Sequence, residues 1–213
     1  MSFFIRLLEA TDTNRREMEA IPKVQSMLNG KMTRESYQAF LMDLYHVVWH
    51  FCPIMATAAS RCPDKFIDVR YHLYHNIDEE KGHETLVLND LAAFGVGPEQ
   101  IRASAPSYPV QAMIAYNYYV SERVHPCCVI GMLYVLEIIS SVYGGQVSGA
   151  ISAGLGMPLP LGFSFLDSHA SMDLDHMEKL RELLQTIDDV AVQELVINAI
   201  QTNFYLFTQF LNR

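Results

Sequence analysis

The sequence predicts an all-α bundle of about seven or eight helices, formed as a single domain over residues 1–213. Apolar residues recur at helical spacing over most of the chain, and the alternation typical of strands is sparse. The periodic segments are long and are separated by short breaks rich in Gly and Pro. Half of the residues are hydrophobic and 18% are charged, which is enough apolar material for a core and too much for a disordered chain.

The N-terminal part predicts two helices. The first covers residues 4–28, is interrupted or kinked near Pro22, and stops at the Asn-Gly pair at 29–30. Thr33 is expected to cap the second helix. Pro53 lies within its apolar pattern and should kink it, because proline removes a backbone donor and clashes with the preceding turn.

The remaining helices follow from the same periodicity. A third helix is expected over 68–94, with Asp64 as its cap and a break at 95–98. A short helix begins at Pro98 and a longer one covers 109–122. The segment 124–152 is apolar on nearly every face, which indicates a helix in the core. A loop at 152–162 then precedes two closing helices, at about 163–186 and 188–211.

Composition narrows the function. The formal net charge is −9 and no Lys/Arg cluster is present, so neither nucleic acid nor an anionic membrane is expected as a partner. The spacing of the four cysteines matches no zinc motif. No signal peptide is expected, and no run is expected to reach the roughly 18 apolar residues of a membrane span. These features predict a cytoplasmic protein.

The segment FSFLDSHASMDLDHMEKL carries the most informative motif. His169, Asp173 and His176 are spaced as H-x3-D-x2-H, which places them within roughly 60° of one another on one helix face. Imidazole and carboxylate together suit zinc, iron or manganese. A solvated polar face near a helix start is the structural alternative.

A second motif lies in HNIDEEKGHETL. Glu80 and His83 form the Glu-x-x-His pair that di-iron carboxylate bundles use on two of their helices. Glu79, four residues before His83, is a rival ligand. The structural alternative is a surface helix with a salt-bridging Glu, and surface exposure is also the simplest expectation for His72 and His75.

Glu137 is the only ionisable carboxylate in the apolar stretch 129–142. A buried carboxylate needs a partner or must be neutral, and metal coordination would satisfy it. A hydrogen-bonded structural Glu is the alternative. Together the three segments offer two Glu, one Asp and three His, close to the ligand complement of a di-iron site.

Aromatic and histidine side chains near these motifs are candidates for a substrate pocket. His46 and His50 lie four residues apart and beside two aromatic residues, so they could line a pocket or assist proton transfer. A hydrogen-bonded core histidine is the alternative. The predicted pocket residues are Tyr45, His46, Trp49, His50 and Tyr134.

The order of these landmarks resembles that of the haem-oxygenase-like helical proteins, which include haem oxygenases, thiaminase II (TenA-like proteins) and pyrroloquinoline quinone synthase. The resemblance rests on GKMTRESYQAFLMDLYHVVWHF, NIDEEKGHETL, AAFGVGPEQI, LYVLE and the H-x3-D-x2-H motif. The sequence is most similar to the haem-oxygenase-like di-iron oxidases and oxygenases. That resemblance implies two iron ions held by Glu80, His83, Glu137, His169, Asp173 and His176.

The implied function is a non-haem di-iron oxidase or oxygenase that uses O2 to oxidise a small organic substrate. Relatives of this fold are often dimers, so a homodimer is expected. A haem-binding enzyme of the haem-oxygenase type is a rival hypothesis, supported by the Gly144-Gly145-Gln146 stretch but opposed by the absence of any histidine before His46. Two more hypotheses stay open: a non-catalytic helical binding protein of the same fold, and a mononuclear iron or zinc site.

Overall fold

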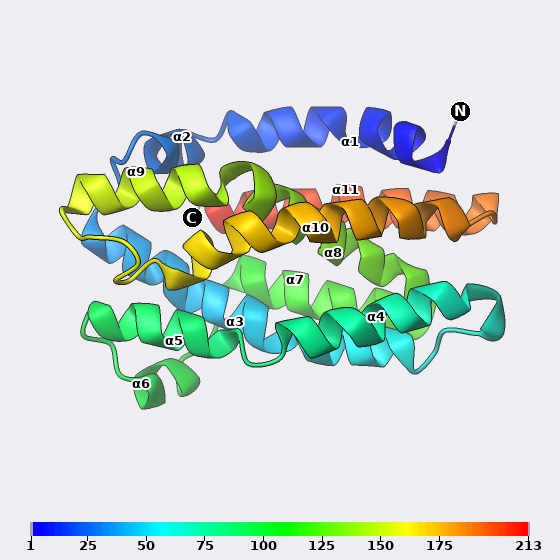
Figure 1. Cartoon of the computed structure of the whole chain (residues 1–213), viewed down its shortest axis with the longest axis horizontal. Coiled ribbons are helices and arrows are strands. Elements are labelled where there is room, and N and C mark those ends of the chain that lie inside the picture. The colour runs from blue at the N-terminus through cyan, green and yellow to red at the C-terminus, as the bar shows by residue number, and fades with distance from the viewer. Residues whose placement is uncertain (1, 213) are drawn as a thin grey trace.

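Eleven α-helical segments and no strand are found in the part of the chain that the computed structural model describes (Figure 1). That part is residues 2–212, without the side chains of residues 170–175. The predicted all-α fold is therefore confirmed. The helices are α1 (Phe3–Glu19), α2 (Pro22–Leu28), α3 (Arg34–Ala59), α4 (Ile67–Glu80), α5 (Glu84–Ala93), α6 (Pro98–Arg102), α7 (Tyr108–Tyr119), α8 (Ile130–Ile139), α9 (Gly145–Leu155), α10 (Ser164–Thr186) and α11 (Val190–Leu211).

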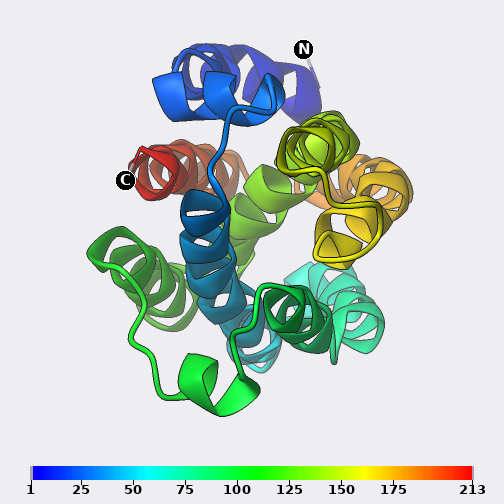
Figure 2. The same cartoon turned by 90° about the vertical axis from the view of Figure 1, so that its left-hand side faces the viewer.

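Helix α3 runs through the middle of the bundle, with the other helices around it (Figure 2). The Thr33 hydroxyl accepts a hydrogen bond from the Ser36 amide at 3.2 Å, which confirms the predicted cap. Pro53 lies inside α3, which continues beyond it to Ala59. The middle of α3 is buried at successive turns, so the helix packs against its neighbours along most of its length.

The third predicted helix, 68–94, is two helices in the structure. Helix α4 ends at Glu80 and α5 begins at Glu84, with Gly82 between them at φ +92°. Glycine adopts positive φ readily because it has no Cβ, so the chain can turn sharply there. Because of this break, Glu80 is the last residue of α4 and His83 is the N-cap residue of α5.

The apolar segment that predicted one core helix contains a π-helical turn. Helices α8 and α9 are joined without interruption through Ser140–Gly144, where the backbone is π-helical. Such single turns hold one more residue than the α-helix around them and are frequent at functional sites. Before this segment, Val120–Val124 is also π-helical and Pro126–Val129 is a 3₁₀ turn.

Buried aspartates hold two helix starts from neighbouring helices. Asp90 on α5 accepts hydrogen bonds from the amides of Ser164 (2.8 Å) and Phe165 (2.9 Å) and from the Ser164 hydroxyl (2.7 Å), all at the start of α10. Asp43 on α3 accepts from the Ser107 amide, just before α7, at 2.8 Å. The first amides of a helix lack partners within it, so these carboxylates fix where both helices begin.

Two helical stretches are long and apolar enough to cross a membrane by length and composition, contrary to the expectation that no segment reaches this limit. They are Arg34–Ala59 and Pro126–Leu155, and 50% and 61% of their most apolar windows are buried inside the bundle. Core helices of soluble proteins have the same character. That no membrane is a partner stays a prediction.

Helices α8 and α11 approach so closely at Gly131 that a side chain there has no room. A Cβ at this position would lie 2.6 Å from the Ala199 carbonyl carbon. Gly131→Ala should therefore lower the free energy of unfolding by about 1–3 kcal/mol, as overpacking does. Urea denaturation measures this.

Gly149→Ala is the matched control, because a Cβ there meets nothing within 4 Å. It should leave stability unchanged or raise it by up to about 1 kcal/mol through helix propensity. Equal midpoints for the two variants would contradict the close approach.

Candidate metal centre

Three of the six predicted ligands form a compact group. Glu80, His83 and His169 each offer one ligand atom, and these atoms all lie within 4.8 Å of one another. The His83 Nδ1 lies 2.8 Å from the Glu80 Oε2 and 3.0 Å from the His169 Nε2. The group joins the end of α4, the start of α5 and the first turns of α10.

His169 is held in an orientation suited to coordination. Its Nδ1 lies 2.8 Å from the Phe165 carbonyl oxygen, and the Phe165 ring stacks on the imidazole with centroids 4.0 Å apart. Because a carbonyl only accepts hydrogen bonds, Nδ1 carries the proton and Nε2 faces Glu80 and His83. Metal-binding histidines are oriented in the same manner by a carbonyl or carboxylate on the outer nitrogen.

Glu80 is buried yet stays ionised. Burial acts to raise the pKa of its carboxyl, but the neighbouring His169 and His83 imidazoles outweigh burial and hold the pKa at about 2. At neutral pH the group therefore combines a carboxylate with two imidazoles. Two histidines and one carboxylate are the ligands that non-haem Fe(II) oxygenases use, so the donor set fits iron.

His176 lies beside this group, and its two ring nitrogens are near different glutamates. Its Nδ1 is 3.9 Å from the Glu80 Oε1, and its Nε2 is 3.2 Å from the Glu79 Oε2. Glu79 also contacts the Lys179 Nζ at 3.3 Å and the His75 Nε2 at 3.0 Å. This arrangement favours Glu80 as the ligand and Glu79 as the group that orients His176.

Glu137 projects from α8 and is only 5% exposed. The Asn76 amide group donates to its Oε1 at 3.5 Å. Glu137 lines the same cavity as Glu80 and His169, although it does not belong to the 4.8 Å group. The side chain of Asp173, the remaining predicted ligand, lies outside the described residues.

Two further residues on α4 face this region and were not predicted to do so. His72, Asn76 and Glu80 follow one another at intervals of four, the spacing that aligns side chains along one helix face. His72 was expected at the surface, as His75 is. Instead its Nε2 is buried, with no hydrogen-bond partner among the described residues. Burial, reinforced by the nearby positive charges of His75, His176 and Lys179, lowers the His72 pKa to about 4, so this imidazole is neutral at pH 7.

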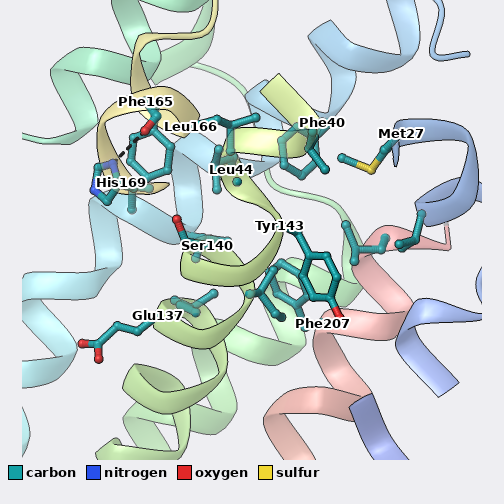
Figure 3. Close-up of a pocket in the computed structure, with 18 of the residues that line it drawn as sticks. Met27, Phe40, Leu44, Glu137, Ser140, Tyr143, Phe165, Leu166, His169 and Phe207 are labelled. Carbon is teal, nitrogen blue, oxygen red and sulfur yellow. Dashed lines mark hydrogen bonds between the residues drawn. The ribbon is translucent and has the colours of Figure 1, made fainter. Parts of the chain in front are cut away.

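A cavity of about 130 Å³ adjoins the metal ligands. Glu80, Glu137 and His169 are part of its wall, and α3, the π-helical turn, α10 and α11 contribute apolar side chains. Glu137 and His169 lie on one side of the cavity in Figure 3, and Met27, Tyr143 and Phe207 lie on the other. The cavity is thus polar at the metal ligands and apolar beyond them.

None of the five predicted pocket residues belongs to the described wall of this cavity. On α3 the cavity is lined instead by residues at 40, 44, 47, 48 and 51, and a substrate role for the five residues stays a prediction. Trp49 is 50% exposed on another face. His46 and His50 are instead hydrogen-bonded histidines, at 3.0 Å from Ser104 and 3.1 Å from Tyr118.

Tyr134, the fifth predicted pocket residue, is fully buried on α8. Its ring packs edge-on against Phe204 of α11, and its hydroxyl lies 3.4 Å from an Arg15 guanidinium nitrogen on α1. The side chain therefore joins α1, α8 and α11 and does not face the cavity.

The capping of α10 by Asp90 should matter for metal binding as well as for stability, because it sets the position of His169. Asp90→Ala removes three hydrogen bonds from the helix start. The variant should lose about 2 kcal/mol of stability or more and bind Fe(II) more weakly. Urea denaturation and anaerobic Fe(II) titration measure the two effects.

Asp189→Ala serves as the control, since Asp189 caps α11 through the amides of Ala191 and Val192, away from the ligands. It should lower stability and leave Fe(II) affinity unchanged. If both variants weaken binding equally, α10 capping has no specific role at the site.

The two adjacent glutamates should differ in their effect on metal binding. Glu80→Gln removes a ligand and should abolish tight binding. Glu79→Gln leaves the ligands in place and should weaken affinity by roughly 10–100-fold, as loss of an orienting group does. The reverse order in Fe(II) titrations would assign Glu79 as the ligand.

A known family matches most of the chain. The family described as "Iron-containing redox enzyme" matches residues 38–206. This range contains all six predicted ligands and most of the cavity wall.

Among curated proteins, the chain is similar to the 4-aminobenzoate synthases of Chlamydia. It is 26% identical to that of Chlamydia muridarum over 189 residues, which cover 86% of this chain and 78% of the relative. The Chlamydia trachomatis protein is also 26% identical, over 163 residues that cover 74% of this chain and 69% of the relative.

Solved structures share the fold. A domain with a haem-oxygenase-like fold from Shewanella denitrificans superposes with a TM-score of 0.85 at 23% identity, covering 100% of this chain and 91% of that chain. A TenA homologue from Pseudomonas syringae gives 0.82 at 18%, covering 99% and 91%. Haem oxygenase-1 from Synechocystis, solved with haem, gives 0.80 at 17%, covering 100% and 91%. The predicted haem-oxygenase-like fold is confirmed.

Proposed function

This chain belongs to the family of iron-containing redox enzymes, and from that premise we propose that it is a non-haem di-iron oxidase or oxygenase. It would use O2 to oxidise a small organic substrate. The observation that carries the proposal is the buried group of Glu80, His83 and His169 at the polar end of a cavity. An exposed cluster of the same residues would carry much less weight, because surface carboxylates and histidines often lie together without a metal.

The remaining predicted ligands are available for a second ion. His176 lies next to Glu80, and Glu137 faces the same cavity from α8. Asp173 would complete the set. Iron bound by these residues supplies the electrons that O2 needs in order to react with an organic molecule.

The chain's own residues have distinct tasks in this proposal. Glu80, His83 and His169 hold the metal, and the Phe165 carbonyl keeps the His169 Nε2 directed toward it. Asn76 orients Glu137 through its side-chain amide. The apolar wall of the cavity limits the access of bulk water, which protects reactive species from side reactions.

The relatives support the class of chemistry more than the product. The curated relatives are named 4-aminobenzoate synthases, but an identity of 26% does not carry a product from one enzyme to another. The similarity to haem oxygenases is one of fold, at 17% identity. We therefore assign redox chemistry with iron to this chain and do not assign 4-aminobenzoate as its product.

Metal counting tests the proposal. Anaerobic titration with Fe(II) should saturate near two ions per chain, and subsequent exposure to O2 should produce a transient visible absorption band and consume O2. His169→Ala and Glu137→Ala should each reduce the stoichiometry. His75→Ala is the control, because this histidine is exposed and lies outside the group of described ligands.

Each other outcome has a defined meaning. Saturation at one ion would indicate a mononuclear centre. No binding, or binding unchanged in His169→Ala and Glu137→Ala, would rule out the proposed site. A Soret band with added haem that persists in His169→Ala would instead support a haem-binding enzyme.

A further inference from the structure

We propose that the cavity beside the metal ligands binds an uncharged, largely apolar molecule about the size of one aromatic ring, with a single polar group placed near Ser140. The inference rests on the proposed function and names the substrate class of the same site. It is argued from the lining of the cavity, its size and one unsatisfied hydroxyl.

The lining leaves little for a charged ligand to pair with. Beyond the metal ligands, the wall consists mainly of aliphatic, aromatic and methionine side chains, such as Leu44, Val47, Phe51, Leu136, Leu166 and Phe207. No lysine or arginine is among the described residues that line the cavity. Transferring a charge from water into such surroundings without a partner is strongly unfavourable.

The polar residues of the wall add to this selectivity. Glu80 and Glu137 are part of the wall, so an anion bound in the metal-free protein would lie near their negative charges and be repelled. The Tyr143 hydroxyl already donates to Glu19 of α1. These residues therefore disfavour a carboxylate or phosphate ligand.

Ser140 offers the one hydroxyl without a partner among the described residues of the wall. Its Oγ is buried and makes no hydrogen bond within that part of the chain. It lies in the π-helical turn, one helical turn beyond Glu137 (Figure 3). A buried hydroxyl without a partner is unfavourable, so a ligand that bonds to it gains affinity.

The volume sets the size of the ligand. The cavity measures about 130 Å³. An engineered cavity of about 150 Å³ lined by Leu, Ile and Phe in another protein stays dry and binds benzene. A single ring or a short alkyl chain therefore fits, with its apolar end toward Met27 and Phe207 and its polar end toward Ser140 and the metal ligands.

Three probes of one size and different polarity test the inference on the metal-free, full-length protein: toluene, benzyl alcohol and benzoate. Binding is measured by ligand-observed NMR and by the shift in thermal midpoint. Toluene and benzyl alcohol should bind, and benzoate should bind at least tenfold more weakly. Because no metal is present, failure here is separate from failure of Fe(II) binding.

Two variant pairs locate the probes. Ser140→Ala should weaken the binding of benzyl alcohol by about three- to tenfold and leave the affinity for toluene unchanged, because the variant loses one hydrogen bond. Ser141→Ala is its control, because the neighbouring Ser141 hydroxyl donates to Ile138 and does not line the cavity. Leu44→Phe should fill the cavity and weaken the binding of both neutral probes. Met42→Phe, on the same helix but outside the cavity wall, should leave their binding unchanged.

Contrary results would overturn the inference. These are benzoate binding as tightly as benzyl alcohol, no binding of either neutral probe, or no effect of Leu44→Phe in a folded variant. If Leu44→Phe does not fold, Val47→Ile replaces it. This variant adds one methyl group to the wall and should weaken the binding of toluene. Unchanged toluene binding in that variant would place the probe elsewhere.

Discussion

The buried carboxylate of Asp90 fixes the helix on which the candidate metal centre depends. It sits on α5 and accepts three hydrogen bonds from the start of α10. Since His169 lies little more than one turn into α10, the cap sets both its height and its rotation relative to α5. The same helix, α5, is preceded by His83. One interaction thus holds two ligands from distant parts of the chain in register.

Burying several ionisable side chains in an apolar bundle has a thermodynamic consequence. Glu80, Glu137, His169 and His176 are each 5–8% exposed, and such groups destabilise a fold unless they find partners. Here they partly satisfy one another, together with Asn76 and the Phe165 carbonyl. The bundle therefore tolerates a polar interior at one place, and that place adjoins the cavity.

Periodicity and residue chemistry predicted the fold and much of the centre, and geometry explains where they failed. The spacing of His169 and His176 and the lone Glu137 in an apolar stretch identified candidate ligands because polar residues in core positions stand out. The predicted pocket residues on α3 were chosen because they are polar or aromatic, whereas the cavity is lined there by apolar residues such as Leu44, Val47 and Phe51. The break at Gly82 was missed because a single glycine inside a helical pattern does not reveal its φ. Which of two adjacent glutamates faces the centre depends on helix rotation, which sequence alone does not fix.

The π-helical turn at Ser140–Gly144 changes the direction in which side chains project on the two sides of the long core helix. A π turn accommodates one residue beyond the α-helical count, which corresponds to a rotation of about 100° between the segments on either side. The π turn therefore changes the direction of Val147 relative to Glu137 by about 100° from that in an uninterrupted α-helix, and in the structure both residues line the cavity. An ancestral insertion or deletion of a single codon in this turn would have re-aimed one half of the helix without moving the other. Related chains could thus diverge in cavity shape while keeping their carboxylate in place.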